Sequence, residues 1–495
     1  MDMTLRQIET ATEGRILRGD PGLRIAGIST DTRKRVEGAL FFALQGASFD
    51  AHEFLPRAAR RGAAAAVVHR KNAREHALGL PIVLVEDTTR ALGDLARWHR
   101  NRCTTTTVIG VTGSNGKTTV KEMLYHILNG VVRSIRSIAN YNNEIGVPLT
   151  LFQMRPRDIY AVVEMGTNSP GEIARLCEIA GPDIGLITAI AATHLQGLGS
   201  VAGVAEEKAP LLRQAARRGG AFYNADDFWS RRIARNLTGT VYSFGIDNEA
   251  DLRATNLRSN PAGMSFKVVG GPRLYIPIPG GHNARNALAA VAAARKLGID
   301  WNTIAERLAS FRLPSHRMQI KQVEGVTLID DAYNANPASM RAAAKTLSRM
   351  QCRGRKVFVA GDMLELGEDS VAFHRRLGAT LAGFGFDYLF GIGRHTRHLL
   401  ASAAGEGMPE TDLVLRESRE QLAEALLAVL EPGDTVLFKA SRGIRLEEVA
   451  EQIEAGLRGR AVPKPERDEA PAPRRPDLQQ SHETRPHSPV GRPVG

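Results

Sequence analysis

The sequence predicts an α/β protein of three domains, in which a phosphate-binding loop follows a strand of a central parallel sheet with helices on both faces. Three observations indicate this class. The 495 residues are too many for one ordinary core, and at roughly 150 residues per domain they suggest about three domains. The composition, 43% hydrophobic and 24% charged, is typical of a soluble globular protein. Short β-branched runs alternate with segments of helical periodicity between residues 107 and 190.

Three shifts in composition divide the chain. The polar run RNRCTTTT precedes a strand-like segment near residue 107, and FRLPSH separates a helical stretch from another strand near residue 316. After about residue 460 the chain is rich in proline and charge and has almost no large apolar side chain, which predicts disorder. The expected divisions are residues 1–103, 104–313 and 314–460 as domains, and 461–495 as a disordered Pro/Arg-rich tail.

Several classes of protein are excluded by the composition. No run of eighteen apolar residues predicts a membrane span, and the first ten residues lack an apolar export signal, so a cytoplasmic location is expected. Cys103, Cys177 and Cys352 lie too far apart to suggest a disulfide framework or a zinc site. The net charge of +12 would suit nucleic acid, but only 5% of residues are aromatic and no basic cluster carries stacking side chains. We therefore expect no nucleic-acid partner.

The segment around the loop supports a parallel sheet. TVIGVTG (107–113), IYAVVEMG (159–166) and IGLITAI (184–190) are predicted to be buried strands. The stretch that follows the first strand has apolar residues at helical spacing, namely Val120, Met123, Leu124, Ile127 and Leu128. Ligands of such sheets bind at the carboxyl ends of the strands. Gly113, Glu164 and His194 lie at or just beyond these ends.

The loop VTGSNGKTT (111–119) departs from the usual phosphate-loop pattern, which requires a glycine where this chain has Val111. Gly113 and Gly116 would let the backbone turn its N–H groups toward phosphate oxygens. Lys117 would reach the β- and γ-phosphates, and the Thr118 hydroxyl would bind Mg²⁺. The alternative is an ordinary strand–turn–helix with an exposed lysine. The register of strand, loop and helix favours a phosphate loop of a variant family.

Other polar residues allow both a functional and a structural interpretation. Glu164 is either a magnesium ligand or a capping or salt-bridge residue. A lone histidine such as His194 is more often structural, and a lone lysine such as Lys208 more often solvated. Asn283 and Asn286 begin an alanine-rich helix, where an amide either caps the helix or reads an adenine edge. The adjacent carboxylates of residues 330–331 end a predicted strand.

Four stretches, taken in order, resemble the Mur ligase family. They are TGSNGKTT (112–119), NYNNEIGVP (140–148), DDAYNANPASM (330–340) and GDMLELGEDS (361–370). The first is shared with folylpolyglutamate synthetases, whereas the others are particular to the MurF type, and the D-N-P-R signature of the diaminopimelate-adding type is absent. The resemblance extends from about residue 25 to about residue 455. It implies an N-terminal UDP-sugar-binding α/β domain, a central ATP-binding domain and a C-terminal Rossmann-like ligase domain.

The same resemblance implies an activity in peptidoglycan synthesis. The enzyme would join D-alanyl-D-alanine to UDP-N-acetylmuramoyl-tripeptide through an acyl phosphate, using ATP and two Mg²⁺ ions, with a carbamate on Lys208. A monomer that closes its domains around the substrates is expected. Rival interpretations are a sibling ligase, a folylpolyglutamate synthetase, or a nucleotide hydrolase that uses no carboxylate substrate.

Residue roles follow from the resemblance. The catalytic candidates are Lys117, His194, Lys208 and Asn143, although the residues alone do not decide between Asn142 and Asn143 near the γ-phosphate. The nucleotide-binding candidates are Gly113, Ser114, Asn115, Gly116, Lys117, Thr118, Thr119, Asn283, Asn286, Arg317 and Asp331. The metal-binding candidates are Thr118, Glu164, His194 and Lys208. The substrate-binding candidates are Ser29, Thr30, Asp31, Arg33, Asp50, His52, Asn334, Asn336, Ser441 and Arg442.

This chain departs from the family pattern at four places. Ala51 stands for a glycine in the loop on the uridine side, Ala332 for a common serine and Ala440 for a common glycine. Ala209 and Pro210 follow Lys208 where the family has a different sequence. Because proline removes a helical hydrogen bond, Pro210 is expected to disturb the helix around Lys208.

Overall fold

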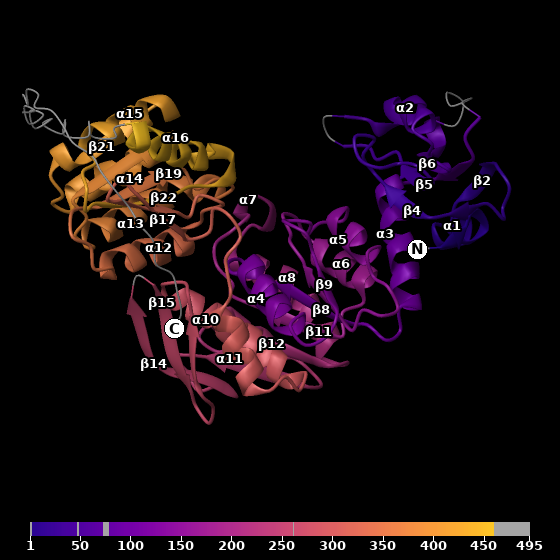
Figure 1. Cartoon of the computed structure of the whole chain (residues 1–495), viewed down its shortest axis with the longest axis horizontal. Helices are drawn as coiled ribbons and strands as arrows, with labels where there is room; N and C mark the ends of the chain where they lie inside the picture. The colour runs from indigo at the N-terminus through magenta and orange to yellow at the C-terminus, as the bar shows by residue number, and fades with distance from the viewer. Residues whose placement is uncertain (1, 47–48, 73–78, 261, 460–495) are drawn as a thin grey trace, which may run out of the picture.

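The computed structural model describes residues 2–46, 49–72, 79–260 and 262–459, and it contains three large sheets that follow one another along the chain (Figure 1). Their strands span residues 15–85, 107–276 and 319–439. In Figure 1 the N-terminal and C-terminal parts stand apart on either side of the central part. The α/β class and the three-part architecture are therefore as predicted, and the predicted tail lies outside the described residues.

The N-terminal part is built on a five-stranded sheet in the order β2-β7-β6-β5-β4. All its pairs are parallel except β2 against β7. The elements are β1 (Met3–Thr4), α1 (Leu5–Ala11), β2 (Arg15–Arg18), β3 (Arg24–Ile25), β4 (Gly27–Ser29), β5 (Ala39–Phe42), α2 (Leu55–Arg60), β6 (Ala65–His69), β7 (Ile82–Val85) and α3 (Thr88–Arg102). Strands β5 and β7 are apolar without alternation because both faces of this sheet are covered.

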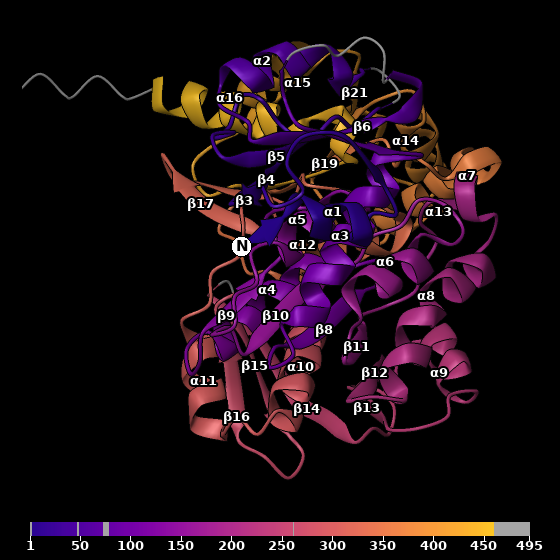
Figure 2. The same cartoon turned by 90° about the vertical axis from the view of Figure 1, so that its right-hand side faces the viewer.

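Helix α3 connects the N-terminal part to the central part. It packs Leu92 and Leu95 into the N-terminal core and also contacts α5 and α6 of the central part, which lie beside it in Figure 2. Arg175 of α6 pairs with Asp94 at 2.9 Å, and Arg100 pairs with Asp183 at 2.8 Å. These contacts fix α3 to the central part.

The central part is built on a nine-stranded sheet in the order β16-β15-β14-β13-β12-β11-β8-β10-β9. Its strands are β8 (Thr107–Thr112), β9 (Ser134–Arg136), β10 (Tyr160–Glu164), β11 (Ile184–Ile187), β12 (Gly220–Asn224), β13 (Val241–Gly245), β14 (Leu252–Asn260), β15 (Gly263–Val268) and β16 (Arg273–Ile276). Its helices are α4 (Lys117–Leu128), α5 (Gly146–Leu151), α6 (Glu172–Ala180), α7 (Leu195–Leu198), α8 (Val201–Ala216), α9 (Phe228–Ala234), α10 (Gly281–Lys296) and α11 (Trp301–Ala309).

The central sheet is parallel around the loop, as predicted, and it also has an antiparallel extension that was not predicted. All neighbouring strands among β8–β14 pair in parallel, but β15 pairs antiparallel with both β14 and β16. The antiparallel strands β15 and β16 continue the sheet beyond β14, and α10 and α11 cover this extension. In β16, exposed and buried residues alternate, so only one face of this strand is buried. The pattern of the strands around the nucleotide loop, which are buried on both faces, gave no indication of it.

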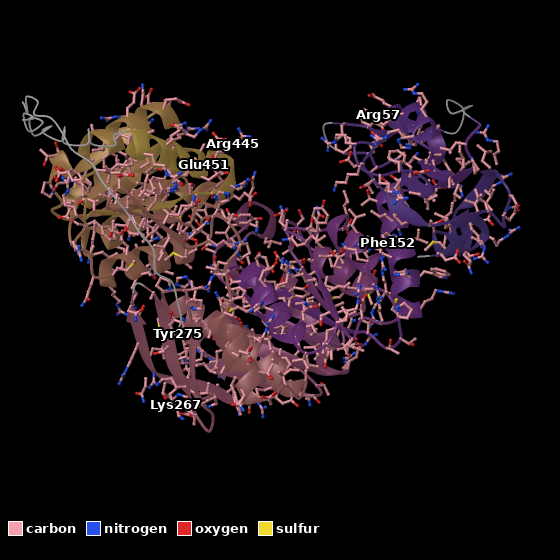
Figure 3. All side chains as sticks on the ribbon, viewed as in Figure 1. Arg57, Phe152, Lys267, Tyr275, Arg445 and Glu451 are labelled. Atoms are coloured by element: carbon pink, nitrogen blue, oxygen red, sulfur yellow. The ribbon has the colours of Figure 1, made fainter. Side chains whose placement is uncertain are left out.

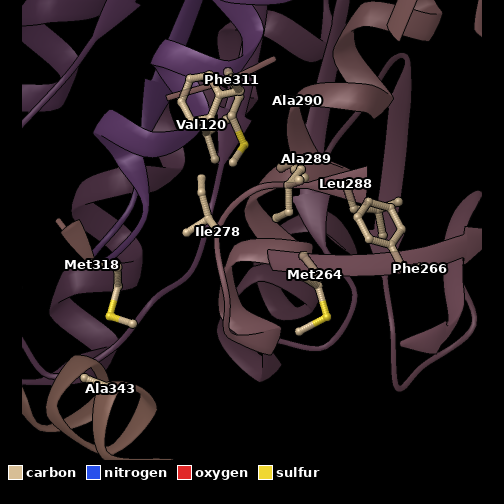
Figure 4. Packing of buried hydrophobic residues seen from close by; sticks show 14 of the residues in the cluster. Val120, Met264, Phe266, Ile278, Leu288, Ala289, Ala290, Phe311, Met318 and Ala343 are labelled. Carbon is tan, nitrogen blue, oxygen red and sulfur yellow. The ribbon is translucent and has the colours of Figure 1, made fainter. Parts of the chain in front are cut away.

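Helices cover both faces of the sheet. Helix α4 buries Val120 in a core shared with α10 and α11, where Phe311 also packs (Figure 4). Neighbouring residues of β8 face opposite ways, so Ile109 enters this core and Val108 enters the core under α5 and α6. The alanines of α10 let it lie close to α4 and to the sheet, and Ala289 and Ala290 are fully buried.

Pro210 does not interrupt α8, contrary to the disturbance expected from the sequence. The helix runs continuously from Val201 to Ala216 with Pro210 inside it. Ala209 before this point and Leu211 after it are buried, so packing against β11 and β12 holds the helix despite the lost hydrogen bond. Lys208 is in the third turn, well away from the helix start.

The C-terminal part is built on a six-stranded sheet in the order β17-β18-β22-β19-β20-β21, parallel except at β17. The elements are β17 (Gln319–Val323), β18 (Val326–Asp330), α12 (Pro337–Arg349), β19 (Lys356–Gly361), α13 (Ser370–Ala382), β20 (Tyr388–Ile392), α14 (Thr396–Gly405), β21 (Leu413–Arg416), α15 (Arg419–Val429), β22 (Thr435–Lys439) and α16 (Leu446–Gly459). Within the described ranges, no helix has the length and apolar character needed to cross a membrane.

Candidate active site

A pocket of about 910 Å³ lies at the carboxyl ends of β8, β10, β11 and β12, between the central and C-terminal parts. The chain leaves β8 toward β9 and β10 on one side and later forms β11 on the other side. This is the switch point at which ligands of parallel sheets bind. The volume is within the range of small-molecule sites.

The loop after β8 forms one wall of the pocket. Gly113 and Gly116 have positive φ angles of 147° and 84°, and a Cβ at either would collide with the Thr188 hydroxyl or the Asn286 amide. The Ser114 N–H donates to the Ala189 carbonyl at 2.7 Å, which attaches the loop to the end of β11. Val111 is a buried residue of β8. The turn therefore begins two residues after the position where the usual pattern has its first glycine.

Lys117 and Thr118 begin α4 at the floor of the pocket. The Lys117 ammonium donates to the Gly113 carbonyl at 2.7 Å, and burial lowers its pKa below the usual lysine value. The Thr118 hydroxyl donates to Glu164 Oε2 at 2.9 Å and accepts from Arg317 at 3.0 Å. Residues of three distant segments thus meet at one hydroxyl. Thr119, Ser114 and Asn115 also line the pocket.

The two neighbouring asparagines have different surroundings. Asn142 Nδ2 donates to Glu164 Oε1 at 3.0 Å. The Asn143 side-chain oxygen instead accepts from the Gly146 N–H at 2.9 Å at the start of α5. Both residues line the pocket, but the structure brings Asn142 to the strand-end carboxylate.

Thr118 and Glu164 form an oxygen-donor pair suited to Mg²⁺, which prefers one or two protein ligands together with substrate phosphates. Among the described residues, no group of three or more His, Cys, Asp or Glu side chains could hold a metal ion without such help. The donors therefore fit a magnesium ion that arrives with a nucleotide.

His194 joins the pocket to the C-terminal part. Its backbone is left-handed, with φ 52°, and its Nδ1 lies 2.6 Å from Glu365 Oε2 in the loop after β19. Burial and the charge of Lys117 lower the pKa of His194, while Glu365 opposes this shift. The imidazole is thus positioned by a carboxylate from the opposite part.

Lys208 is 1% exposed within α8. Burial and the nearby Lys117 charge lower its pKa from 10.5 to about 7, against the opposing effect of Glu207. The Glu207 carboxylate accepts from the Gly171 and Ile173 N–H groups at the start of α6, at 2.6 and 2.7 Å. A large fraction of Lys208 is therefore a neutral amine near pH 7.

The start of α10 lines another wall. The Asn283 amide donates to the Pro279 carbonyl at 2.9 Å, and Asn286 donates to Asn283 Oδ1 at 3.4 Å. Burial lowers the pKa of His282 to about 4, so its ring is neutral at physiological pH. These residues face the pocket together with Arg317, whose guanidinium lies 4.0 Å from the centre of the Tyr333 ring.

The C-terminal part closes the pocket with hydrogen bonds to the loop. Asn336 caps α12 and donates to Asn115 Oδ1 at 2.7 Å, and Asn115 donates back at 3.2 Å. Asp331 accepts from the buried Lys439 at 2.6 Å, and Lys439 also donates to the Asn334 carbonyl at 3.0 Å.

The remaining substrate candidates lie away from this pocket. Asp31 holds the Arg33 guanidinium at 2.9 Å, beside Ser29 and Thr30, in the N-terminal part. Asp50 and His52 contact each other in the same part. In the C-terminal part, Ser441 donates to the Ala335 carbonyl at 3.2 Å, and Arg442 pairs with Glu447 at 2.6 Å. In Figure 3, Arg57 and Arg445 mark the facing sides of the two outer parts.

Sequence reasoning missed Lys121, His282 and Glu365 in and around the site. Lys121 follows Lys117 by one helical turn, a spacing that was available in the sequence. His282 adjoins Asn283 and lines the pocket. Glu365 comes from a stretch noted only for its resemblance, and nothing local indicates its contact with His194.

Comparison with known protein families gives matches along most of the chain. The family models described as "Mur ligase family, catalytic domain", "Mur ligase middle domain" and "Mur ligase, glutamate ligase domain" match residues 24–100, 111–294 and 316–442. Together they match parts of all three sheets.

Individual relatives match over nearly their whole length. The UDP-N-acetylmuramoyl-tripeptide–D-alanyl-D-alanine ligase of Escherichia coli K12 is 36% identical over 92% of this chain and 99% of its own. A crystal structure of MurF from Acinetobacter baumannii is 32% identical, with a TM-score of 0.84, over 92% of this chain and 99% of that chain. A MurF ligase from Thermotoga maritima in complex with ADP is 29% identical, with a TM-score of 0.77, over 88% of this chain and 98% of that chain.

Proposed function

Because this chain belongs to the Mur ligase family, we propose that it is the ATP-dependent ligase that joins D-alanyl-D-alanine to UDP-N-acetylmuramoyl-tripeptide. The product would be the pentapeptide precursor of peptidoglycan, released with ADP and phosphate. The near-complete coverage of relatives that carry this name supports the choice of substrates. The observation that carries the proposal within the structure is the pocket that joins Lys117, Thr118 and Glu164 at the loop after β8.

The chemistry explains why these residues are needed. A peptide carboxylate is a poor electrophile, so the γ-phosphate is first transferred to it to form an acyl phosphate. Both reactants are anions, and Lys117 stabilises the charge that develops during transfer. Bound Mg²⁺ would supply further charge compensation, with Thr118 and Glu164 as its protein ligands. The amine of D-alanyl-D-alanine then attacks, and phosphate leaves.

The nucleotide would occupy the wall formed by the loop and α10. The backbone N–H groups of Asn115, Gly116 and the start of α4 would face its phosphates, while the N–H of Ser114 is bonded to Ala189. Asn286 would read the adenine edge, with Arg317 on the phosphate side and Asp331 at the ribose. Asn142 is the better candidate for the γ-phosphate than Asn143, because its amide donates to Glu164 while the Asn143 side-chain oxygen accepts from the Gly146 N–H.

The three sheets are proposed as the cores of three domains, residues 1–103, 104–313 and 314–460. Asp31, Arg33 and His52 would bind the UDP-sugar in the first domain, and Asn334, Asn336, Ser441 and Arg442 would act on the dipeptide side in the third. A monomer acting in the cytoplasm remains part of this proposal.

Lys208 is proposed as a carbamate that binds a second Mg²⁺ beside His194. A neutral amine adds CO₂ and loses a proton to give a carboxylate-like group, and the pKa of Lys208, lowered to about 7, supplies that neutral amine. A charged ammonium at this position would instead be destabilised by burial and by the positive charge of Lys117. The test is Lys208→Ala assayed with and without short carboxylic acids. Recovery of activity with the acids is expected, and full activity without them would refute the carbamate.

The function is tested by phosphate release. We expect release with ATP, UDP-N-acetylmuramoyl-tripeptide and D-alanyl-D-alanine together, and almost none when either substrate is omitted. Tripeptides ending in diaminopimelate and in lysine are compared, since the third residue is open. Release without a carboxylate substrate would indicate a nucleotide hydrolase, and activity with a UDP-muramoyl dipeptide and a free diamino acid would indicate a sibling ligase.

A further inference from the structure

Lys121 is a lysine with no solvent exposure, located one helical turn after Lys117 on α4. Its ammonium donates to the carbonyls of Ser137 and Ala139, each at 3.0 Å. It also lies 3.1 Å from Glu122 Oε1 and 3.5 Å from Glu164 Oε2. Two of the three ammonium protons are donated to these carbonyls, and the two carboxylates lie close enough to pair with its charge.

This arrangement separates the roles of the two lysines of α4. Lys117 lines the pocket and is partly exposed, whereas Lys121 is directed toward the turn after β9 and does not line the pocket. A buried charge is retained only when it is well paired, and the partners of Lys121 are the backbone and carboxylates. Because it does not line the pocket, Lys121 acts through the groups that it holds and not by contact with a substrate phosphate.

The groups held by Lys121 belong to the metal side of the pocket. Glu164 is 2% exposed, and its Oε2 faces both the Thr118 hydroxyl and Lys121. The backbone N–H of Glu164 donates to Ser137 Oγ at 3.0 Å, so one residue of the turn binds both Lys121 and Glu164. The strand-end carboxylate is therefore fixed from two directions.

The turn itself is strained. Ala139 has a φ of 48°, a left-handed conformation that is uncommon for residues other than glycine. Its carbonyl is one of the two that accept from Lys121. The chain then proceeds within three residues to Asn142, whose amide donates to Glu164 Oε1. A contact that stabilises the turn thus also sets the position of Asn142.

We propose that Lys121 is a positioning residue, which ties the 137–139 turn to Glu164 so that Glu164, Thr118 and Asn142 keep the spacing needed for a magnesium-bound nucleotide. The proposal rests on the proposed function only in its use of ATP with Mg²⁺. Loss of Lys121 releases the turn and leaves two carbonyls and a buried carboxylate without their shared cation.

The experiment measures how strongly Mg²⁺ improves nucleotide affinity, with no ligase substrate present. ADP is titrated calorimetrically into the full chain in EDTA and in MgCl₂. The Mg²⁺ ratio, which is the Kd in EDTA divided by the Kd in MgCl₂, is compared between wild type and Lys121→Met. We expect the ratio to fall about tenfold or more, as for other residues that orient a metal ligand. The Kd in EDTA should change little, because Lys117 and the 113–116 loop are intact.

Two further variants make the result specific. Arg136→Met removes the guanidinium that pairs with Glu122 at 2.6 Å but contacts neither Glu164 nor the turn carbonyls, so its ratio should equal that of wild type. Ser137→Ala removes only the hydroxyl that accepts from the Glu164 N–H, and it should reduce the ratio about two- to fivefold. This milder change keeps the test available if Lys121→Met does not fold.

A merely structural role predicts a different pattern. It would lower the melting temperature of Lys121→Met while leaving the Mg²⁺ ratio unchanged, and that outcome overturns the proposal. An unchanged ratio in Ser137→Ala would also contradict it. If wild type itself shows no improvement of ADP affinity by Mg²⁺, the proposed use of magnesium-bound nucleotide fails. If wild type shows the improvement and the variants keep it, only the role of Lys121 fails.

Discussion

At the scale of single residues, Gly116 and Gly171 form a natural pair for comparison. Both are helix N-caps with a positive φ, 84° and 89°, but only at Gly116 would a Cβ meet another side chain, that of Asn286. We expect Gly171→Ala to cost about 1–2 kcal/mol of stability and to leave ADP binding unchanged. Gly116→Ala should have the same strain and also weaken ADP binding at least tenfold. Equal ADP affinities in the two variants would show that the loop does not contact the nucleotide.

Replacement of Lys117 tests whether its positive charge in the pocket is needed for ligation. Its ammonium contacts only the Gly113 carbonyl among the described residues, so replacing it disturbs little of the fold. We expect Lys117→Ala to reduce ligation by about a thousandfold or more, since phosphoryl transfer depends on charge stabilisation. Its melting temperature should remain near that of wild type. Phosphate release is the measurement, with Lys321→Ala, an exposed lysine paired with Glu454, as the control. Turnover near that of wild type would refute the role of Lys117.

Lys208 couples stability to pH. Its pKa is about 7 in the folded chain and near 10.5 when unfolded, so between these values the unfolded state binds more protons and stability rises with pH. The destabilising effect is complete below pH 7 and absent above about pH 10.5. In CO₂-free buffer, Lys208→Met should therefore be more stable than wild type by up to a few kcal/mol at pH 6, with a smaller difference at pH 9. Denaturant unfolding at both pH values measures this, and a difference independent of pH would contradict the lowered pKa.

At the scale of elements, α8 and α12 contain proline in different places. Pro210 is inside α8, where its ring cannot donate to the Glu206 carbonyl, whereas Pro337 is at the first turn of α12. We expect Pro210→Ala to raise the free energy of unfolding by about 1–3 kcal/mol. Pro337→Ala should lower it by about 0.4–1 kcal/mol, because it gives the unfolded chain more freedom. Thermal unfolding compares them, and a loss of stability in Pro210→Ala would mean that the proline itself is required by the packing of α8.

The elements also show what could be predicted from sequence. The strand–loop–helix at residues 107–128 was predictable because β-branched runs, glycines and helical spacing are local signals. The antiparallel strands β15 and β16 were not predicted, since a half-buried strand has a weak pattern. The choice between Asn142 and Asn143, the pair Asn115–Asn336 and the burial of Lys121 depend on contacts between distant segments. Such contacts leave no local pattern in a single sequence.

At the scale of the whole molecule, the three parts are connected unequally. The N-terminal part is fixed to the central part through α3 and its ion pairs with Arg175 and Asp183. The C-terminal part contacts the central part through residues that line the pocket, including Asn336 and Arg317. The connection between α11 and β17 contains two non-glycine residues with positive φ, His316 at 61° and Met318 at 47°. We therefore expect nucleotide binding to act on the contacts that orient the C-terminal part.

This arrangement predicts closure of the molecule around its substrates. The candidate residues for the UDP-sugar, such as Asp31 and Arg33, lie outside the pocket, so the acceptor carboxylate reaches the γ-phosphate only if the outer parts approach each other. Small-angle scattering with a non-hydrolysable ATP analogue, Mg²⁺ and the UDP-muramoyl tripeptide should show a radius of gyration that falls toward the roughly 23 Å of a compact chain of this length. Each ligand alone should give a smaller change, and Gly116→Ala with both ligands should give only the change seen with the UDP-muramoyl tripeptide alone, because this variant binds the nucleotide weakly. An unchanged radius in wild type with all ligands bound would mean that the substrates meet without closure, through an extended peptide that reaches from the N-terminal part to the pocket.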